Sequence, residues 1–160
     1  ESLIALAVAF LFMGLVVLIY FRTYIPSIAI ILAAFSDMVV ALAVINVLDV
    51  RIGTAGIAAF LMLIGYSVDT DILLTVRVLK RKEGTVMDRI ISSIKTGMTM
   101  TITAIVSTIV ALLVTQSEVI RQIMLILLIG LIADIFNTWI QNVGLLRIYI
   151  ERKAKKGIVI

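Results

Sequence analysis

Five long apolar stretches dominate this sequence of 160 residues and limit what it can fold into. Each is near or above the roughly 20 helical residues that cross a hydrocarbon core of about 30 Å. Backbone N–H and C=O groups in such a core must be satisfied internally, which a helix does within one segment. The sequence therefore predicts an all-α, polytopic membrane protein, a bundle of five transmembrane helices. The predicted helices cover residues 2–21, 26–48, 54–78, 96–114 and 119–149.

The amino-acid composition also indicates that the chain lies in a lipid bilayer. We expect residues 1–160 to form a single transmembrane domain. Apolar residues make up 62% of the chain and charged residues only 15%, against about a quarter charged in soluble domains. The sequence contains no cysteine and no histidine, which excludes disulfides and any chemistry that needs a thiolate or an imidazole. The acidic residues lack the spacing of a metal site. We therefore expect no catalytic residue, no metal, no cofactor, no nucleic-acid partner and no enzymatic activity.

The segment KRKEGTVMDRIISSIK, residues 80–95, separates the third and fourth apolar stretches. It predicts an interfacial amphipathic helix over residues 85–95, with Thr85 and Asp88 at the positions of a capping box. The alternative is a charged loop that only touches lipid. The residues that share its apolar face at helical spacing are Val86, Met87, Ile90, Ile91 and Ile94.

The distribution of positive charge predicts the orientation, because cytoplasmic loops carry an excess of Lys and Arg. Only Arg51 and Arg121 fall on the side opposite to the other twelve basic residues. We therefore expect an integral protein of the cytoplasmic membrane, with the start of this chain outside and its end in the cytoplasm. No signal sequence precedes the first apolar stretch, so an upstream helix is expected. The twelve are Arg22, Arg77, Lys80, Arg81, Lys82, Arg89, Lys95, Arg147, Arg152, Lys153, Lys155 and Lys156.

Four aspartates lie at membrane depth, where a charged side chain is expensive and often functional. They are Asp37, Asp69, Asp71 and Asp134. We expect them to handle a proton or another ion, or to contact a partner's helices; satisfied polar groups that only join helices are the alternative. Asp69 and Asp71 point to nearly opposite faces of one helix, at about 100° per residue, so one of them is expected to face the bundle interior. The last helix carries a polar stripe of Asp134, Asn137 and Gln141.

Small residues predict where helices approach one another. Gly65 lies four residues before Asp69, on the same helix face, and is expected to let a neighbouring helix come close. Thr99, Thr103 and Ser107 follow one another at spacings of four residues on the fourth helix. This face predicts helix packing and hydrogen bonds between helices.

The stretch GYSVDTDILLTVRVLKR, which begins at Gly65, resembles the fourth transmembrane helix of SecF, an accessory subunit of the Sec protein-export machinery. GLIADIFNTW in the last helix (Gly130–Trp139) looks like the archaeal branch of SecF. Lys95, Thr96 and Thr99 match the K-T-x-x-T pattern of SecF at the start of the preceding helix. The resemblance covers the whole chain. It implies one earlier helix and an extracytoplasmic domain before these five helices. Gly65 and Asp69 also match the G-x-x-x-D pattern of the wider resistance–nodulation–division superfamily.

The resemblance implies a SecD-like subunit, the protein-conducting channel and a translocating polypeptide as partners, and assistance to export that bacteria drive with the proton-motive force. In the bacterial pattern, the proton-linked acid aligns with Thr70 of this chain. This chain has acids at the two flanking positions instead, Asp69 and Asp71. Bacterial relatives carry Arg where this chain has Lys95, which lacks the bidentate fork. Asp69 is the first candidate for proton or ion coupling, followed by Asp71, Asp134, Asp37 and Lys95.

Two other functions remain open at the level of sequence. One is the membrane half of an exporter of lipids or hydrophobic small molecules from the same superfamily. The other is a passive scaffold subunit of the export complex without ion coupling, which the displaced acid favours.

Overall fold

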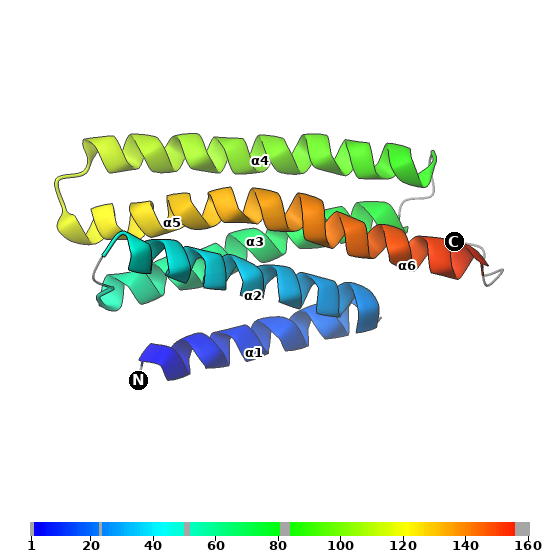
Figure 1. Ribbon diagram of the computed structural model, residues 1–160, viewed down its shortest axis with the longest axis horizontal. Coiled ribbons are helices and arrows are strands. Elements are labelled where there is room, and N and C mark those ends of the chain that lie inside the picture. The colour runs from blue at the N-terminus through cyan, green and yellow to red at the C-terminus, as the bar shows by residue number, and fades with distance from the viewer. Residues whose placement is uncertain (1, 23, 50–51, 81–83, 156–160) are drawn as a thin grey trace.

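The computed structural model describes residues 2–22, 24–49, 52–80 and 84–155, which are almost entirely helical and contain no strand. Five of its helices are long and apolar enough to cross a membrane, which confirms the predicted all-α polytopic fold. Figure 1 shows them side by side in one bundle. The elements are α1 (Ser2–Phe21), α2 (Tyr24–Val47), α3 (Thr54–Lys80), α4 (Val86–Val114), α5 (Glu118–Phe136), η1 (Asn137–Asn142) and α6 (Val143–Lys155).

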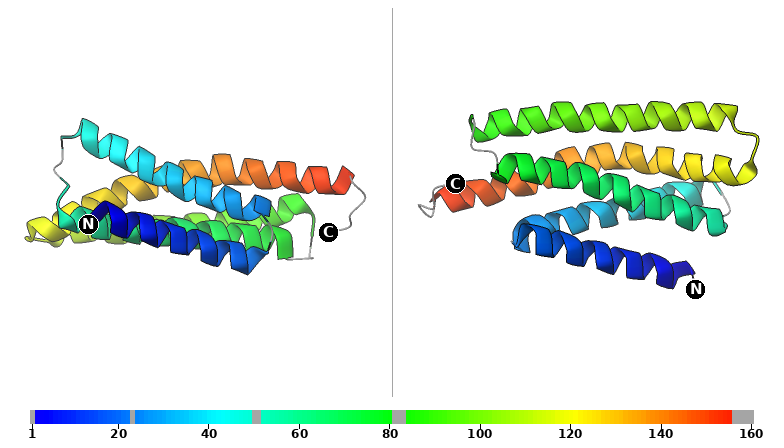
Figure 2. Two further views of the ribbon diagram at one scale, coloured as in Figure 1. Left: turned by 90° about the horizontal axis from the view of Figure 1, so that it is seen from below. Right: turned by 180° about the vertical axis from the view of Figure 1, so that it is seen from behind.

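Two helices form the edges of the bundle and three form its centre. α1 lies at one edge and α4 at the opposite edge, in Figure 1 and in the right view of Figure 2 alike. α3 contacts α2, α4 and α5, and α2 also contacts α5. The outer helices expose large apolar side chains such as Leu11 and Leu113. Lipid is the solvent that such surfaces require.

A row of small side chains lets α2 pack closely against the centre of the bundle. Ala29, Ala33, Asp37 and Ala41 recur every four residues and are all buried. Residues at this spacing lie on one face of a helix, and small residues allow backbones to approach. Asp37 is therefore carried into the interior by the alanines around it. α2 begins at Tyr24, two residues before the predicted start, because Pro26 falls in the first turn, where an N–H has no intrahelical partner anyway.

The predicted segments 85–95 and 96–114 are not separate elements, because residues 86–114 form one unbroken helix, α4. The capping box is present: the Asp88 N–H donates to the Thr85 hydroxyl, and the Thr85 N–H donates to the Asp88 carboxylate. Ile90 is buried and Ile94 half-buried against α3, while Met87 and Ile91 are exposed. At 1.5 Å per residue α4 is about 43 Å long, so it extends beyond a hydrocarbon core of about 30 Å.

Two arginines tie this end of α4 to α3. The Arg77 Nη1 donates to the Ser92 carbonyl oxygen at 3.2 Å and to the Thr96 hydroxyl at 2.7 Å. The Arg89 Nη1 donates to the Val78 carbonyl oxygen at 3.0 Å. These contacts between the two helices, together with the buried Ile90, hold residues 86–95 in line with the rest of α4.

The predicted fifth helix, residues 119–149, is one continuous helical path from Glu118 to Lys155 with a π-helical segment inside it. That segment, η1, follows Asp134 by three residues. The N–H of Asn137 donates to the carbonyl oxygens of both Ala133 and Asp134, where α5 ends and η1 begins. π-helical segments are rare and often lie at functional sites.

Close approach between elements occurs at glycines other than Gly65. A Cβ atom added at Gly65 would meet nothing within 4 Å, so the predicted close approach of a helix of this chain is not observed there. A Cβ at Gly97 would lie 2.6 Å from the Trp139 ring, and one at Gly130 would overlap the Leu63 side chain. Gly97 therefore leaves room for the Trp139 ring, and Gly130 leaves room for Leu63.

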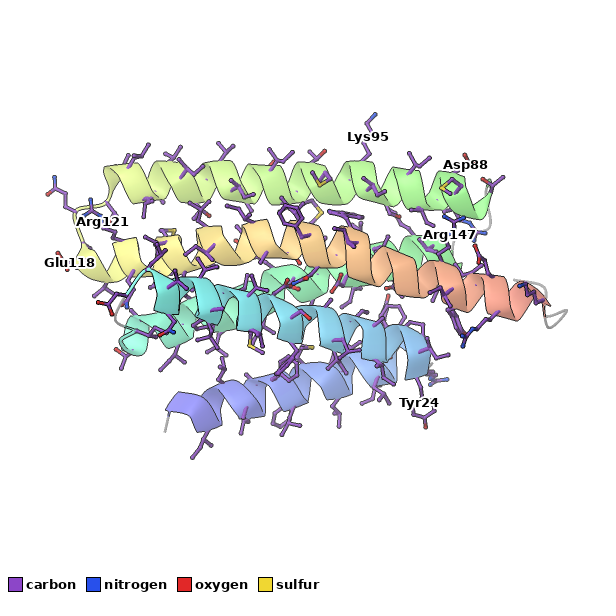
Figure 3. All side chains as sticks on the ribbon, viewed as in Figure 1. Tyr24, Asp88, Lys95, Glu118, Arg121 and Arg147 are labelled. Atoms are coloured by element: carbon purple, nitrogen blue, oxygen red, sulfur yellow. The ribbon has the colours of Figure 1, made fainter. Side chains whose placement is uncertain are left out.

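Charged side chains gather toward the ends of the bundle. Figure 3 shows Glu118 and Arg121 at one end and Asp88 and Arg147 at the other, while Lys95 points from α4 away from the other helices. Four residues used to predict orientation lie outside the described residues: Arg51, Arg81, Lys82 and Lys156.

Candidate functional site

Three of the four membrane-depth aspartates converge at the centre of the bundle. Asp37 comes from α2, Asp71 from α3 and Asp134 from α5, and each is at most 1% exposed. A carboxyl group buried this deeply needs hydrogen-bond donors around it. The hydrogen-bonding groups come from Ser67 of α3 and from Asn137 and Thr138 of η1. We call these six residues the carboxyl cluster.

Asp37 is bound from two different helices. The Ser67 hydroxyl donates a short hydrogen bond to the Asp37 Oδ2. The Asn137 Nδ2 donates to the Asp37 Oδ1 at 2.7 Å. Both carboxyl oxygens of Asp37 therefore have donors, and these bonds join α2 to α3 and to η1.

Asp134 lies directly beside Asp37. The two carboxyl groups are within hydrogen-bonding reach of one another, and the Ser67 hydroxyl reaches both of them. Two ionised carboxylates in contact in a medium of low dielectric constant repel strongly. A proton between the two groups removes that repulsion and forms a hydrogen bond in its place.

Thr138 connects this pair to the third carboxyl group. Its Oγ1 lies 3.0 Å from the Asp71 Oδ1 and 3.0 Å from the Asp134 Oδ1. Thr138 is itself fully buried. The carboxyl cluster is thus a continuous set of hydrogen bonds through α2, α3, α5 and η1.

The chemistry that this arrangement supports is the holding and exchange of protons. The donors described above are hydroxyl and amide groups, which are neutral. Among the described residues no group of three or more acidic side chains has the geometry to hold a metal ion. Carboxyl groups buried inside membrane proteins commonly belong to proton relays.

Asp69, the first candidate from the sequence, is not part of the carboxyl cluster. It is exposed, whereas Asp71 is fully buried, which confirms that the two point to different faces of α3. Asp69 lines a small pocket of about 100 Å³ with Tyr66, Thr70 and Met100. The Thr70 hydroxyl, at the position of the bacterial acid, donates to the Tyr66 carbonyl oxygen of its own helix at 3.1 Å.

Lys95 and the small-residue face of α4 lie along an open groove. The hydroxyls of Thr99, Thr103 and Ser107 donate to carbonyl oxygens of their own helix, at 2.7, 2.7 and 2.9 Å. The predicted hydrogen bonds between helices are therefore not made by these three side chains. They line a groove of about 870 Å³ together with Met62 of α3 and Met124 of α5.

Sequence reasoning missed two members of the carboxyl cluster, Ser67 and Thr138, as functional candidates. Each lies four residues from a buried aspartate, Ser67 before Asp71 and Thr138 after Asp134. That spacing places both on the face of the acid, and it is the signal that could have identified them. The side chain of Gln141, the last member of the predicted stripe, lies outside the described residues.

These observations describe a polytopic α-helical membrane protein with three buried carboxyl groups at its centre. A family model described as "Protein export membrane protein SecD/SecF, C-terminal" matches residues 1–152. This chain belongs to the SecD/SecF family.

Individual relatives agree over nearly the whole chain. The protein-export membrane protein SecF of Thermococcus gammatolerans is 48% identical over 158 residues, which cover 99% of this chain and 50% of that protein. SecF of Methanothermobacter thermautotrophicus is 49% identical, over 94% of this chain and 54% of that protein. SecF of Methanocaldococcus jannaschii is 46% identical, over 98% and 57%. The chain spans about half the length of the curated relatives it matches.

Proposed function

We propose that this chain is the membrane part of an accessory subunit of protein export. In this proposal the subunit resides in the cytoplasmic membrane and acts with a SecD-like subunit at the protein-conducting channel. The observation that carries the proposal is the family match over residues 1–152, together with SecF relatives at 44–49% identity. The translocating polypeptide is the substrate.

We further propose that the carboxyl cluster couples export to the proton-motive force. A charge that moves across 100 mV gains about 2.3 kcal/mol, which is enough to bias two arrangements of a helix bundle. The hydrogen bonds of the cluster join α2, α3 and η1. A proton gained or lost there changes contacts between helices and not only within one. These contacts support Asp37, Asp71 and Asp134, more than Asp69, as the proposed coupling residues.

The open groove of α4 supports a second part of the proposal, the docking of a SecD-like helix. Small residues at intervals of four are typical of faces where membrane helices meet, yet Thr99, Thr103 and Ser107 are all exposed in this chain. Tyr66 lines both this groove and the pocket of Asp69. Gly65 and Asp69, also exposed, therefore belong to the same proposed contact surface.

The coupling proposal is tested in the full-length protein with Asp37→Asn, Asp71→Asn and Asp134→Asn. Each is expected to lower export that depends on an imposed proton gradient by about tenfold or more, while export in the absence of a gradient changes little. Asp69→Asn is the comparison and is expected to have a smaller effect. Unchanged gradient-dependent export in all three cluster variants would contradict the coupling role and favour a passive scaffold.

The partner proposal is tested by gentle solubilisation of native membranes and mass spectrometry of what copurifies with the tagged protein. A SecD-like subunit is expected. Thr103→Leu fills the groove and is expected to reduce that recovery. Val106→Leu, on an exposed part of α4 outside the groove, is the matched control and is expected to leave recovery unchanged. Equal recovery with both variants would mean that the partner helix docks elsewhere.

A further inference from the structure

Thr138 is in contact with two carboxyl groups but carries a single hydroxyl hydrogen. Its Oγ1 is 3.0 Å from an oxygen of Asp71 and 3.0 Å from an oxygen of Asp134. One hydrogen cannot be donated to two acceptors at once with good geometry. Both contacts are hydrogen bonds only if one of the carboxyl groups is protonated and donates to Thr138, which then donates to the other.

Thr138 joins two parts of the carboxyl cluster. Asp134 and Asp37 are in direct reach of one another, and the Thr138 hydroxyl links Asp134 to Asp71. Thr138 belongs to η1, where the helix changes to the wider π-helical turn. Its neighbour Asn137 binds Asp37 of α2 while Thr138 reaches Asp71 of α3. Two consecutive residues of η1 thus form hydrogen bonds with two different helices, α2 and α3.

A second observation concerns the next turn of α3 after Asp71. Thr75 lies one turn further along α3, on the same face as Ser67 and Asp71. It is fully buried, and its hydroxyl oxygen has no hydrogen-bond partner among the described residues. A buried hydroxyl without a partner is rare and calls for an explanation. Ser67, Asp71 and Thr75 thus form a row of buried polar side chains on one face of α3.

We propose that Thr138 is the relay that passes a proton between Asp71 and Asp134. The proposal rests on the proton-coupling function above and names the residue that makes the transfer. The carboxyl O–H of Asp71 gives its proton to the Thr138 Oγ1, and the Thr138 hydroxyl gives its own hydrogen to the Asp134 carboxylate. One O–H bond breaks and one forms at Thr138, which is neutral before and after. The net change is one proton moved from Asp71 to Asp134.

The test uses the full-length protein with its partner in proteoliposomes and measures proton flux with a trapped pH-sensitive dye. Thr138→Val keeps the β-branched shape and removes the hydroxyl, whereas Thr138→Ser keeps the hydroxyl. Thr101→Val is the matched control, because Thr101 is also buried but its hydroxyl donates to the Gly97 carbonyl oxygen of its own helix at 3.1 Å. Flux is expected to fall at least about tenfold in Thr138→Val and to stay within about threefold in Thr138→Ser.

A readout apart from flux separates a relay from a packing role. The infrared C=O stretch of protonated carboxyl groups is expected to shift in Thr138→Val and to remain in place in Thr138→Ser and Thr101→Val. Thermal unfolding of each variant checks that it folds, and Thr138→Ala replaces Thr138→Val if the latter does not assemble. Equal losses of flux in the Ser and Val variants would overturn the relay, and so would normal flux in Thr138→Val.

The failure of the relay and the failure of proton coupling give different results. If Asp71→Asn and Asp134→Asn abolish flux while Thr138→Val does not, only the relay is overturned. If the aspartate variants also leave flux unchanged, the coupling function itself fails and the relay with it.

Discussion

Asp69 and Asp71 lie only two positions apart, yet one is on the surface and the other is in the interior. Asp71 is fully buried and Asp69 is exposed, because two residues correspond to about 200° around a helix. The buried one is hydrogen-bonded, here with the Thr138 hydroxyl. The superfamily pattern favours Asp69, whereas burial and hydrogen bonding favour Asp71. Resemblance to a motif and position in the bundle are thus separate criteria at this site.

Ser67 provides a test of how much the carboxyl cluster depends on its donors. Ser67→Ala removes the hydroxyl that donates to Asp37 and leaves a buried carboxyl oxygen with one donor fewer. Such a loss costs about 1–3 kcal/mol, so the thermal unfolding midpoint in detergent is expected to fall. Ser107→Ala is the matched control, because Ser107 is exposed and donates to its own helix. Similar midpoints for the two variants would contradict the structural role of Ser67.

At the scale of the elements, helix positions depend on where side chains are absent. Gly97 on α4 accommodates the rigid ring of Trp139 from η1, and Gly130 on α5 accommodates Leu63 from α3. Gly65, although it lies in the recognisable GYSV motif, has open space beside it. Glycines that look alike in the sequence therefore differ in what they do, and only the neighbouring element decides which of them is needed for packing.

Gly97 and Gly65 should respond oppositely to the same change. Gly97→Ala places a Cβ 2.6 Å from the Trp139 ring and is expected to destabilise the protein by about 1–3 kcal/mol, as overpacking does. Gly65→Ala meets nothing and is expected to be neutral or stabilising, because Ala favours a helix by up to about 1 kcal/mol over Gly. Thermal unfolding of both variants measures the contrast. A lower midpoint for Gly65→Ala than for Gly97→Ala would show that this packing description is wrong.

At the scale of the whole molecule, the odd number of spans among the described residues predicts that the two ends of the chain lie on opposite sides of the membrane. Five helices qualify as spans, and α1 begins at one end of the bundle while α6 ends at the other (Figure 1). Which end is cytoplasmic follows from charge and not from shape, since the bundle could be inserted either way up. The excess of Lys and Arg predicts that the end of the chain is cytoplasmic.

The lack of native cysteine allows this orientation to be tested with single cysteine variants. Gln116→Cys lies between α4 and α5, and Lys155→Cys lies at the end of α6; both positions are exposed. A membrane-impermeant maleimide added to intact cells is expected to label Gln116→Cys and to spare Lys155→Cys until the cells are opened. The reverse labelling would invert the predicted topology without changing the fold.

Most of the fold could be predicted from the sequence, because each helix is specified by its own residues. The apolar length of residues 2–21 alone requires a spanning helix of that extent, and α1 has these bounds. The capping box at Thr85 and Asp88 was also readable, because its partners are three residues apart. The break expected between residues 95 and 96 was not found, because Arg77 and Arg89 bind across the interface of α3 and α4 and favour one unbroken helix.

Some features of the candidate site depend on one segment of the sequence, and others depend on contacts between helices. Hydropathy and helical spacing were enough to predict the membrane location, the five spans, and the aspartates that are costly enough to need a reason for being there. The packing of the helices was needed to show that Asp37, Asp71 and Asp134 meet, that Ser67 and Thr138 hydrogen-bond with them, and that Asp69 faces outward. The physical reason is that hydropathy and helical period act along one segment, whereas the bond from Asn137 to Asp37 joins residues 100 positions apart, and no local pattern records which helices pack together.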